Sequence, residues 1–308
     1  MSLRGPPADR DPEALLAFGV VPVDKPSGPT SHQVSAWVRD LAGVEKAAHA
    51  GTLDPKATGC LPVLTGDATR LAGALVGPKE YVAVLQLHAD PPADLEAVLA
   101  EFEGPIYQKP PRKSAVARRL RVREILDLEA LEVDGRRVLL RVACEAGTYV
   151  RKLCHDLGMA LGTGAHMGDL RRTAAEPFDD SALATLHDLA DGLAAWRERG
   201  DDGPLREVVR PAERALSHLP SVTIAPGAAE QVAEGAPVFA PGVLGVEGTA
   251  PPVEPNATPA ELADVPDDGG APSVACYTPN GAAVCLGRLV GHPDAESGVV
   301  VALDRVLV

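Results

Sequence analysis

The stretch that says most about this chain lies at residues 49–59 and reads HAGTLDPKATG. It sets Asp54 directly before Pro55 and between Gly51 and Gly59, ahead of an apolar run. Proline fixes its own φ and disfavours helical geometry in the residue before it, while glycine accepts conformations that other residues resist. The spacing therefore predicts a stiff loop that presents one carboxylate outward, as a reacting acid requires. A plain strand-to-strand connection has the same local pattern, so other parts of the chain must decide between the two.

Length and composition favour a globular protein with more than one domain. The 308 residues are 45% hydrophobic, enough for two cores, and 3% aromatic. The five cysteines contain no C-x-x-C pair, which disfavours a metal site or a disulfide framework and favours free thiols in a reducing compartment. No apolar run approaches the ~20 residues of a membrane span. We therefore expect a cytoplasmic protein with no membrane partner.

The net charge of −14 at neutral pH is unusual for a protein that binds nucleic acid. Acidic residues are concentrated near the C-terminal end, where residues 216–308 hold 11 acids and 2 bases. Lysine is scarce, with 7 lysines against 22 arginines. An acidic, lysine-poor surface is typical of proteins from a very salty cytoplasm, where salt screens the self-repulsion. The composition therefore predicts a halophilic protein that loses structure at low salt.

One strongly basic segment, residues 109–123, interrupts this acidic chain. It contains seven bases and no acid. Such a run is usually a solvated face. Here the acidic background and the predominance of arginine, whose planar fork suits phosphate, favour contact with RNA or DNA. The bases concerned are Lys109, Arg112, Lys113, Arg118, Arg119, Arg121 and Arg123.

Residues 19–216 are expected to form one domain, after a loosely ordered extension at residues 1–18. Stretches with helical periodicity alternate with apolar runs typical of strands. The pair Asp134-Gly135 is a strong signal for a two-residue hairpin turn. Helices and strands mixed in this way predict an α+β fold with a mixed, largely antiparallel sheet. The helical stretches are residues 31–41, 67–75, 95–102 and 150–161, and further helices are expected around 183–215.

The C-terminal part, residues 217–308, has a different pattern. Short strand-like runs alternate with Gly and Pro residues, and Asn280-Gly281 predicts a second hairpin. This pattern favours a small β-barrel. Residues 247–272 interrupt it with six prolines, six acids and no bases, and we expect a flexible surface insertion there.

Several motifs occur in the order typical of one family of RNA-modifying enzymes. Besides the Asp54 loop, they are DKPSGPTS at residues 24–31, KEY at 79–81, GTYVR at 147–151 and GAHMGDLRR at 164–172. From about residue 13 to its end, the chain resembles archaeal members of the dyskerin branch of RNA pseudouridine synthases, the catalytic subunits of H/ACA ribonucleoproteins. The basic segment is similar to the dyskerin version in particular. Residues 217–308 resemble a PUA domain, the RNA-binding module of this family.

The resemblance implies an isomerase that converts uridine to pseudouridine without a cofactor or a metal. Asp54 matches the catalytic carboxylate, which attacks either the base or the sugar, and Arg151 matches the arginine that keeps it ionised. Tyr81 matches the aromatic residue that stacks on the flipped base, and it is a candidate for proton transfer from the sugar. Further positions that match the substrate pocket are Lys25, His49, Tyr149 and Leu170.

The resemblance also implies the partners. Ribosomal RNA directed by an H/ACA guide RNA, with small partner proteins, is one expected substrate, and the T-loop uridine of tRNA (position 55) is the other. The chain departs from the family at Ala48, where glycine is usual, and at Ala117, where lysine is usual. An RNA-binding scaffold without activity is the alternative, although Asp54, Tyr81 and Arg151 are all present. A nucleotide-cofactor oxidoreductase is disfavoured because no glycine fingerprint follows a strand.

Overall fold

The structure is a computed structural model, and it describes residues 3–110, 119–248 and 273–308. The chain forms two compact units. The smaller unit comprises Met1–Val20, Gly66–Arg70 and Arg210–Val308, and the larger comprises Val21–Thr65 and Leu71–Val209. Three bases of the basic segment (Arg112, Lys113 and Arg118) and most of the predicted insertion at 247–272 lie outside the described residues.

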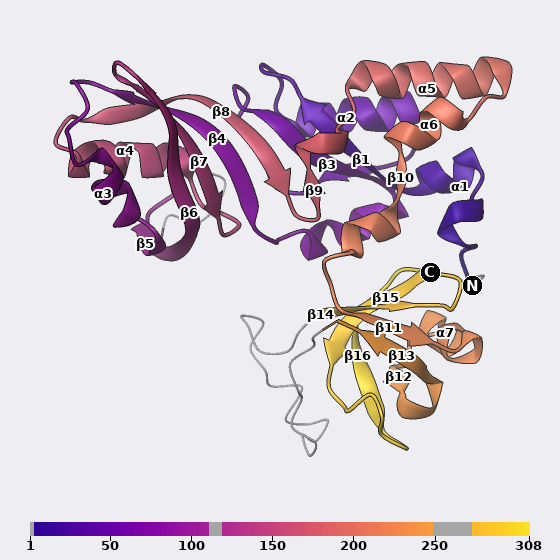
Figure 1. Ribbon diagram of the computed structural model, residues 1–308. Helices are drawn as coiled ribbons and strands as arrows, with labels where there is room; N and C mark the ends of the chain where they lie inside the picture. The colour runs from indigo at the N-terminus through magenta and orange to yellow at the C-terminus, as the bar shows by residue number, and fades with distance from the viewer. Residues whose placement is uncertain (1–2, 111–118, 249–272) are drawn as a thin grey trace. The chain divides into compact units, whose positions relative to one another are not determined.

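A mixed sheet of ten strands organises the larger unit (Figure 1). The strands β3 and β8 run parallel, with Gly59 opposite Arg172, whereas β8, β4, β7, β6 and β5 form an antiparallel series. This confirms the predicted α+β fold with a mixed, largely antiparallel sheet. Its main path is β10 (Arg210–Pro211), β1 (Phe18–Lys25), β3 (Thr58–Gly66), β8 (Ala165–Ala175), β4 (Lys79–Leu87), β7 (Arg137–Cys144), β6 (Arg121–Asp134) and β5 (Gly104–Gln108). Beside it, β2 (Ala47–His49) pairs with β3, and β9 (Phe178–Asp179) pairs with β8.

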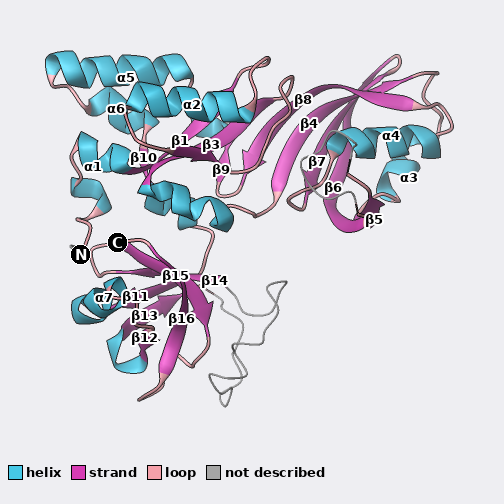
Figure 2. Cartoon of the chain, turned by 180° about the vertical axis from the view of Figure 1, so that it is seen from behind, coloured by secondary structure: helices cyan, strands magenta, loops and turns pink. Residues whose placement is uncertain are grey.

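Helices gather at two places along this sheet (Figures 1 and 2). Near β1 and β3 lie α2 (Ser31–Ala42), α5 (Leu186–Arg199) and α6 (Gly203–Val208). At the other end, α3 (Leu95–Ala100) and α4 (Val150–Ala160) lie beside β5, β6 and β7. Turns of 3₁₀-helix complete the chain: η1 (Pro7–Asp9), η2 (Asp67–Ala74), η3 (Asp180–Ala182), η4 (Ala212–Leu216) and η5 (Ala240–Gly242).

Local signals explain where several elements begin and end. The Thr30 hydroxyl caps α2 by accepting from the Gln33 N–H. In turn, the side-chain oxygen of Gln33 accepts from the Thr30 N–H. The helix stops at Gly43, which has φ +71°. Gly135 has φ +55° in the turn that joins β6 to β7, so the predicted hairpin is confirmed.

The smaller unit is built on a second sheet, of six strands, which surrounds an apolar core. Val222, Ile224, Val274, Val284 and Val301 are fully buried in this core. The order of the strands is β12 (Val238–Phe239), β16 (Val299–Val306), β15 (Ala283–Leu289), β14 (Ser273–Tyr277), β11 (Ser221–Ile224) and β13 (Val243–Glu247). The helix α7 (Pro226–Ala233) contributes apolar side chains to the same core. The predicted hairpin at Asn280-Gly281 is confirmed, because it joins the antiparallel strands β14 and β15.

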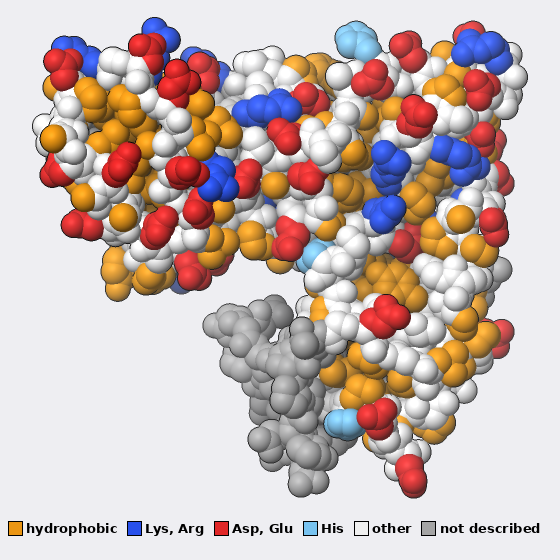
Figure 3. Space-filling model, viewed as in Figure 1, with side chains coloured by type: hydrophobic (Ala, Val, Ile, Leu, Met, Phe, Trp, Pro, Cys, Tyr) orange, Lys and Arg blue, Asp and Glu red, His pale blue; other side chains and the backbone are white. Residues whose placement is uncertain are grey.

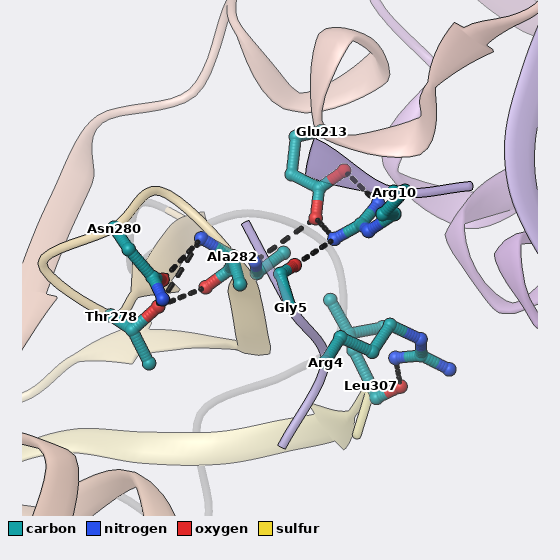
Figure 4. Close-up of polar contacts among 9 residues, drawn as sticks. Arg4, Gly5, Arg10, Glu213, Thr278, Asn280, Ala282 and Leu307 are labelled. Atoms are coloured by element: carbon teal, nitrogen blue, oxygen red, sulfur yellow. Dashed lines mark hydrogen bonds and ion pairs between the residues drawn. The ribbon is translucent and has the colours of Figure 1, made fainter. Parts of the chain in front are cut away.

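The N-terminal segment is an ordered part of the smaller unit, not the loose extension that we expected. A helix, α1 (Pro12–Ala17), is capped by the side chain of Asp11. Arg10 forms a two-pronged ion pair with Glu213, at 2.6 and 2.9 Å, and both side chains are almost completely buried. Arg4 donates to the carbonyl of Leu307, near the other end of the chain (Figure 4). The contacts involve partners more than 200 positions away, so no local pattern could predict them.

Asp and Glu side chains are scattered across the visible face of the molecule, with Lys and Arg side chains between them (Figure 3). No helix within the described ranges is long and apolar enough to span a membrane.

Candidate active site

The loop that carries Asp54 joins β2 to β3, and the start of α2 holds it in place. The Ser31 hydroxyl accepts from the Leu53 N–H at 2.8 Å and donates to the Leu53 carbonyl at 3.0 Å. On the other side of the acid, the Gly28 N–H donates to the Pro55 carbonyl at 2.8 Å. The backbone is therefore fixed immediately before and after Asp54, which confirms the stiff loop predicted from the sequence.

The ammonium of Lys25 fixes the same loop from inside the protein. Its Nζ donates to the carbonyls of Pro26, Pro55 and Ala57 at 2.8–3.0 Å, and the side chain is fully buried. Burial lowers the pKa of Lys25. The three carbonyls occupy all three N–H donors of the ammonium. Lys25 thus positions the loop, while its predicted contact with a substrate stays a prediction.

Arg151 and Asp54 form an ion pair. The guanidinium Nη2 of Arg151 donates to Oδ2 of Asp54, and the two side chains are 49% and 46% exposed. The carboxylate is therefore oriented by a charged donor and is still open to an incoming molecule. Arg151 lies in the first turn of α4. A substrate that covers the pair would exclude water and strengthen the electrostatic interaction.

Gln108, at the end of β5, fixes the start of α4. Its side-chain Oε1 accepts from the Tyr149 N–H at 2.9 Å, and its Nε2 donates to the Tyr149 carbonyl at 3.3 Å. Gln108 is 1% exposed. Because Tyr149 directly precedes the helix that carries Arg151, this buried amide helps to set the position of the arginine.

Tyr81 lies in β4, directly opposite Arg172 of β8. Only 8% of Tyr81 is exposed. Burial raises the pKa of its hydroxyl, and the positive charge of Arg172 and a hydrogen bond from that guanidinium oppose the rise. Tyr81 therefore stays a neutral phenol near neutral pH, able to donate or accept a hydrogen bond.

Two further basic residues lie near Arg172. His49 packs its ring edge against His32 at 4.8 Å, and burial, with the charges of His32 and Arg172, lowers the pKa of His49 to about 4. Lys79 donates to the carbonyls of Leu75 and Gly77, and burial together with Arg172 lowers its pKa to about 8. His49 is therefore neutral at pH 7, whereas most of Lys79 is charged.

The remaining predicted site residues lie on the same elements. Tyr149 is half-buried before α4, and Leu170 is half-buried in β8, two residues before Arg172. Lys109 and Arg119 are exposed in the connection from β5 to β6. Arg121 and Arg123 begin β6, and Arg123 forms an ion pair with Glu145 at 3.3 Å.

Among the described side chains, no group of three or more His, Cys, Asp or Glu residues could hold a metal ion. All five cysteines are free and buried, and burial raises the pKa of Cys60 and of Cys144 to about 11.

Sequence reasoning gave no role to Ser31, Gln108 or Arg172. The Ser31 hydroxyl holds the Asp54 loop, although the motif that contains it indicates no such contact. All three lie within quoted motifs or next to one, but what their side chains contact depends on segments 20 to more than 100 residues away. The motifs therefore indicate where the site around Asp54 lies, whereas the contacts of these three side chains are seen only in the folded structure.

The chain is similar in sequence to known families over most of its length. The DKCLD (NUC011) domain matches residues 5–35, the TruB family pseudouridylate synthase N-terminal domain matches 39–93, and the tRNA pseudouridylate synthase B C-terminal domain matches 151–217. A probable tRNA pseudouridine synthase B from Halobacterium salinarum is 64% identical over the whole of both chains. The protein of the same name from Haloarcula marismortui is 59% identical over all of this chain and 94% of its own.

Solved structures give the same assignment. One chain in the crystal structure of a Cbf5-Nop10-Gar1 complex is 41% identical to this chain. The two superpose with a TM-score of 0.87, over 100% of this chain and 90% of that one. An H/ACA RNP bound to a substrate RNA containing 2′-deoxyuridine contains a chain that is 40% identical, with a TM-score of 0.86 over 99% and 90% of the two chains.

Proposed function

The chain belongs to the TruB family of pseudouridylate synthases, and on this basis we propose that Asp54 is the carboxylate with which it isomerises uridine in RNA. The observation that carries the proposal is the Asp54–Arg151 ion pair, exposed on a loop that Lys25 and Ser31 hold rigid. A preorganised acid that needs no rearrangement before it meets its substrate suits covalent catalysis.

The reaction breaks one bond and forms another within the same nucleotide. The C1′–N1 glycosidic bond is cleaved, the uracil turns over, C1′ bonds to C5, C5 loses its proton, and N1 takes up a proton. Asp54 acts on either the base or the sugar, and Arg151 keeps its carboxylate ionised and oriented. Because the base must leave its stack to reach the acid, we propose that Tyr81, Tyr149, Leu170 and His49 surround it.

We propose two classes of RNA substrate. Relatives named as probable tRNA pseudouridine synthase B favour the T-loop uridine of tRNA (position 55). The H/ACA structures favour uridines of ribosomal RNA, selected by a guide RNA with small partner proteins of the Nop10 and Gar1 kind. Both reactions take place in the cytoplasm of the cell in this proposal.

Two regions are proposed to deliver the RNA. The first is the basic segment, whose described part leads from β5 into β6. The second is the module at residues 217–308, which we propose to be a PUA-like barrel, with the acidic insertion at about 247–272 as its surface loop. Residues 19–216 form the catalytic domain in this scheme, and the ordered segment before it packs in the smaller unit. A six-stranded sheet around its own core supports a separate module.

An Asp54→Asn variant tests the proposal. Purified protein is assayed by tritium release from uridine labelled at C5, on tRNA alone and on a ribosomal fragment with guide RNA and partner proteins. We expect no product from the variant and RNA affinity within about threefold of the wild type, because the two side chains have the same shape. Asp40→Asn, an exposed change on α2, is the matched control and should retain full activity.

Two outcomes would contradict the proposal. Turnover by the Asp54→Asn variant would show that Asp54 is not the catalytic carboxylate. A wild-type chain that binds both RNAs but converts neither would favour the RNA-binding scaffold without activity.

A further inference from the structure

Among the described residues, Arg172 is the largest fully buried side chain, at 1% exposed, and it is not one of the pocket residues assigned above. Its donors reach backbone carbonyls on two segments. The Nε donates to the Cys60 carbonyl at 2.7 Å, and the Nη2 donates to the Gly51 carbonyl at 3.1 Å. These two carbonyls lie at the start and just beyond the end of the loop that carries Asp54.

The same side chain lies beside Tyr81. The two residues face each other across the antiparallel pair β4–β8, and the positive charge of Arg172 opposes the rise that burial causes in the pKa of the phenol. One buried side chain therefore holds the loop of the proposed catalytic acid and lies next to the proposed base-stacking tyrosine.

Two glycines with positive φ lie against Arg172. Gly51 has φ +81°, and a Cβ there would be in ordinary contact with the Arg172 Nη1, at 3.4 Å. Gly59 has φ +97°, and a Cβ there would come within 2.2 Å of the Arg172 carbonyl oxygen. The backbone conformation at Gly51 and the close approach of β3 to β8 at Gly59 thus require glycine next to the arginine.

The charge of Arg172 is not paired with an acid. In the part of the chain that the structure describes, no carboxylate lies within ion-pair distance of it, whereas its neighbour Arg171 forms a two-pronged pair with Asp24. A buried charge without a counter-ion is costly, and such groups are concentrated at functional sites. A cost of this kind is expected only where the charge serves the reaction.

We propose that Arg172 is a positioning residue for the isomerisation: it ties the Asp54 loop to β8 directly opposite Tyr81 and places a fixed positive charge beside that phenol. This inference rests on the proposed function. In it, the carboxylate and the tyrosine hold a constant separation, because the guanidinium fixes the Asp54 loop to the strand that pairs with the strand of Tyr81. The charge also makes the Tyr81 hydroxyl a better donor of a proton than an equally buried tyrosine beside a neutral side chain.

Two variants separate the anchoring from the charge. Arg172→Lys keeps the charge and loses the planar fork, whereas Arg172→Gln loses the charge and keeps one amide donor. Arg171→Lys is the matched control, because it makes the same change one residue away at a half-exposed ion pair. Fluorescence of Trp37 and Trp196, which both lie in the larger unit, checks that each variant is folded.

The first measurement needs no RNA. The chain is labelled with 3-fluorotyrosine, which ionises at lower pH than tyrosine, and the ¹⁹F signals of its 4 tyrosines are followed through a pH titration. The Tyr81→Phe variant identifies the Tyr81 signal. We expect Tyr81 to titrate at higher pH in Arg172→Gln than in the wild type, and at nearly the wild-type pH in Arg172→Lys and Arg171→Lys.

The second measurement is kinetic. Both Arg172 variants should lose on the order of 100-fold in kcat, with KM within about threefold, since a small displacement of reacting groups has an effect of this size. Arg171→Lys should retain wild-type rates. A Tyr81 titration that is identical in Arg172→Gln and the wild type would overturn the inference, and so would an unchanged kcat in that variant. A wild-type chain that is inactive on every RNA would instead count against the proposed function, because the titration can still be read.

Discussion

Lys25 shows how much of the active-site loop depends on one side chain. Its ammonium is the donor for three backbone carbonyls, two of which belong to the Asp54 loop. The sequence placed Lys25 in a motif near the substrate, but it could not show which way the side chain points. The direction of the Lys25 side chain is set by the carbonyls of Pro55 and Ala57, which lie about 30 residues further along the chain. A local sequence pattern cannot reveal such contacts.

Replacing Lys25 with Met should therefore destabilise the larger unit. Buried carbonyls that lose their donors cost free energy, and we expect a loss of about 2 to 4 kcal/mol in the free energy of unfolding. Urea unfolding at constant salt, followed by tryptophan fluorescence, measures it. Lys56→Met, at an exposed position of the same loop, should change stability by less than about 0.5 kcal/mol. Equal effects of the two changes would show that the three carbonyl contacts contribute nothing.

His49 provides a pH dependence with a definite sign. Its pKa is about 4 in the folded chain against 6.5 for a free histidine, because it is buried beside two other basic groups. The unfolded chain therefore binds a proton that the folded chain rejects, and stability is lost as the pH falls from about 6.5 through about 4. The wild type should lose on the order of 3 kcal/mol more than His49→Gln over this range. Urea unfolding of both proteins at about pH 6.5 and about pH 4 measures the difference. An equal loss of stability in the wild type and in His49→Gln would contradict the expectation.

At the scale of elements, Gly59 of β3 is a position that tolerates no side chain. Gly59 is opposite Arg172 in the parallel pair β3–β8, and a side chain there would collide with the backbone of β8. We expect Gly59→Ala to cost more than about 3 kcal/mol in the free energy of unfolding.

Gly135 is the matched control for this change. It also has a positive φ, of +55°, but the space around its Cβ position is empty. Gly135→Ala should therefore cost only about 1 to 2 kcal/mol, the price of the backbone conformation alone. Thermal unfolding of the two variants separates the cost of the steric clash at Gly59 from the cost of a positive φ. Equal losses of stability in Gly59→Ala and Gly135→Ala would rule out the clash.

Elements with local signals were predictable from the sequence, and those fixed by distant partners were not. The capping box at Thr30 and the turns at Gly135 and Gly281 depend on neighbours a few residues away. The pairing of Gln108 with Arg121 across the basic segment, and that of β3 with β8, join residues far apart in the chain. Periodicity carries no information about such pairings.

At the scale of the whole molecule, the ion pair of Arg10 with Glu213 ties the first residues to the smaller unit. Arg10→Met would leave the buried Glu213 carboxylate without its cation, which costs about 3 to 5 kcal/mol. Glu213 also accepts from the Ala283 N–H at the start of β15. Hydrogen exchange measured by mass spectrometry should therefore show faster exchange in β15. Arg39→Met, at an exposed pair on α2, should leave that exchange unchanged.

Net charge leads to a prediction about salt. With a charge of −14, mutual repulsion should destabilise the folded chain when the screening length increases. The midpoint of thermal unfolding should fall as KCl is lowered from molar to millimolar concentrations. A double change of exposed acids on or beside α7, Glu230→Gln with Glu234→Gln, should reduce that fall. A midpoint that does not depend on KCl would contradict the halophilic interpretation of the composition.

The smaller unit combines the first 20 residues with the last 99. Leu307, whose carbonyl accepts from Arg4, is the penultimate residue of the chain. During synthesis, the N-terminal segment emerges first, whereas its partners Glu213 and Leu307 follow about 200 and 300 residues later. The residues of the larger unit, which extends to Val209, are therefore available to fold on the ribosome before those of the smaller unit are all synthesised. The order in which the two units can fold is thus set by the path of the chain.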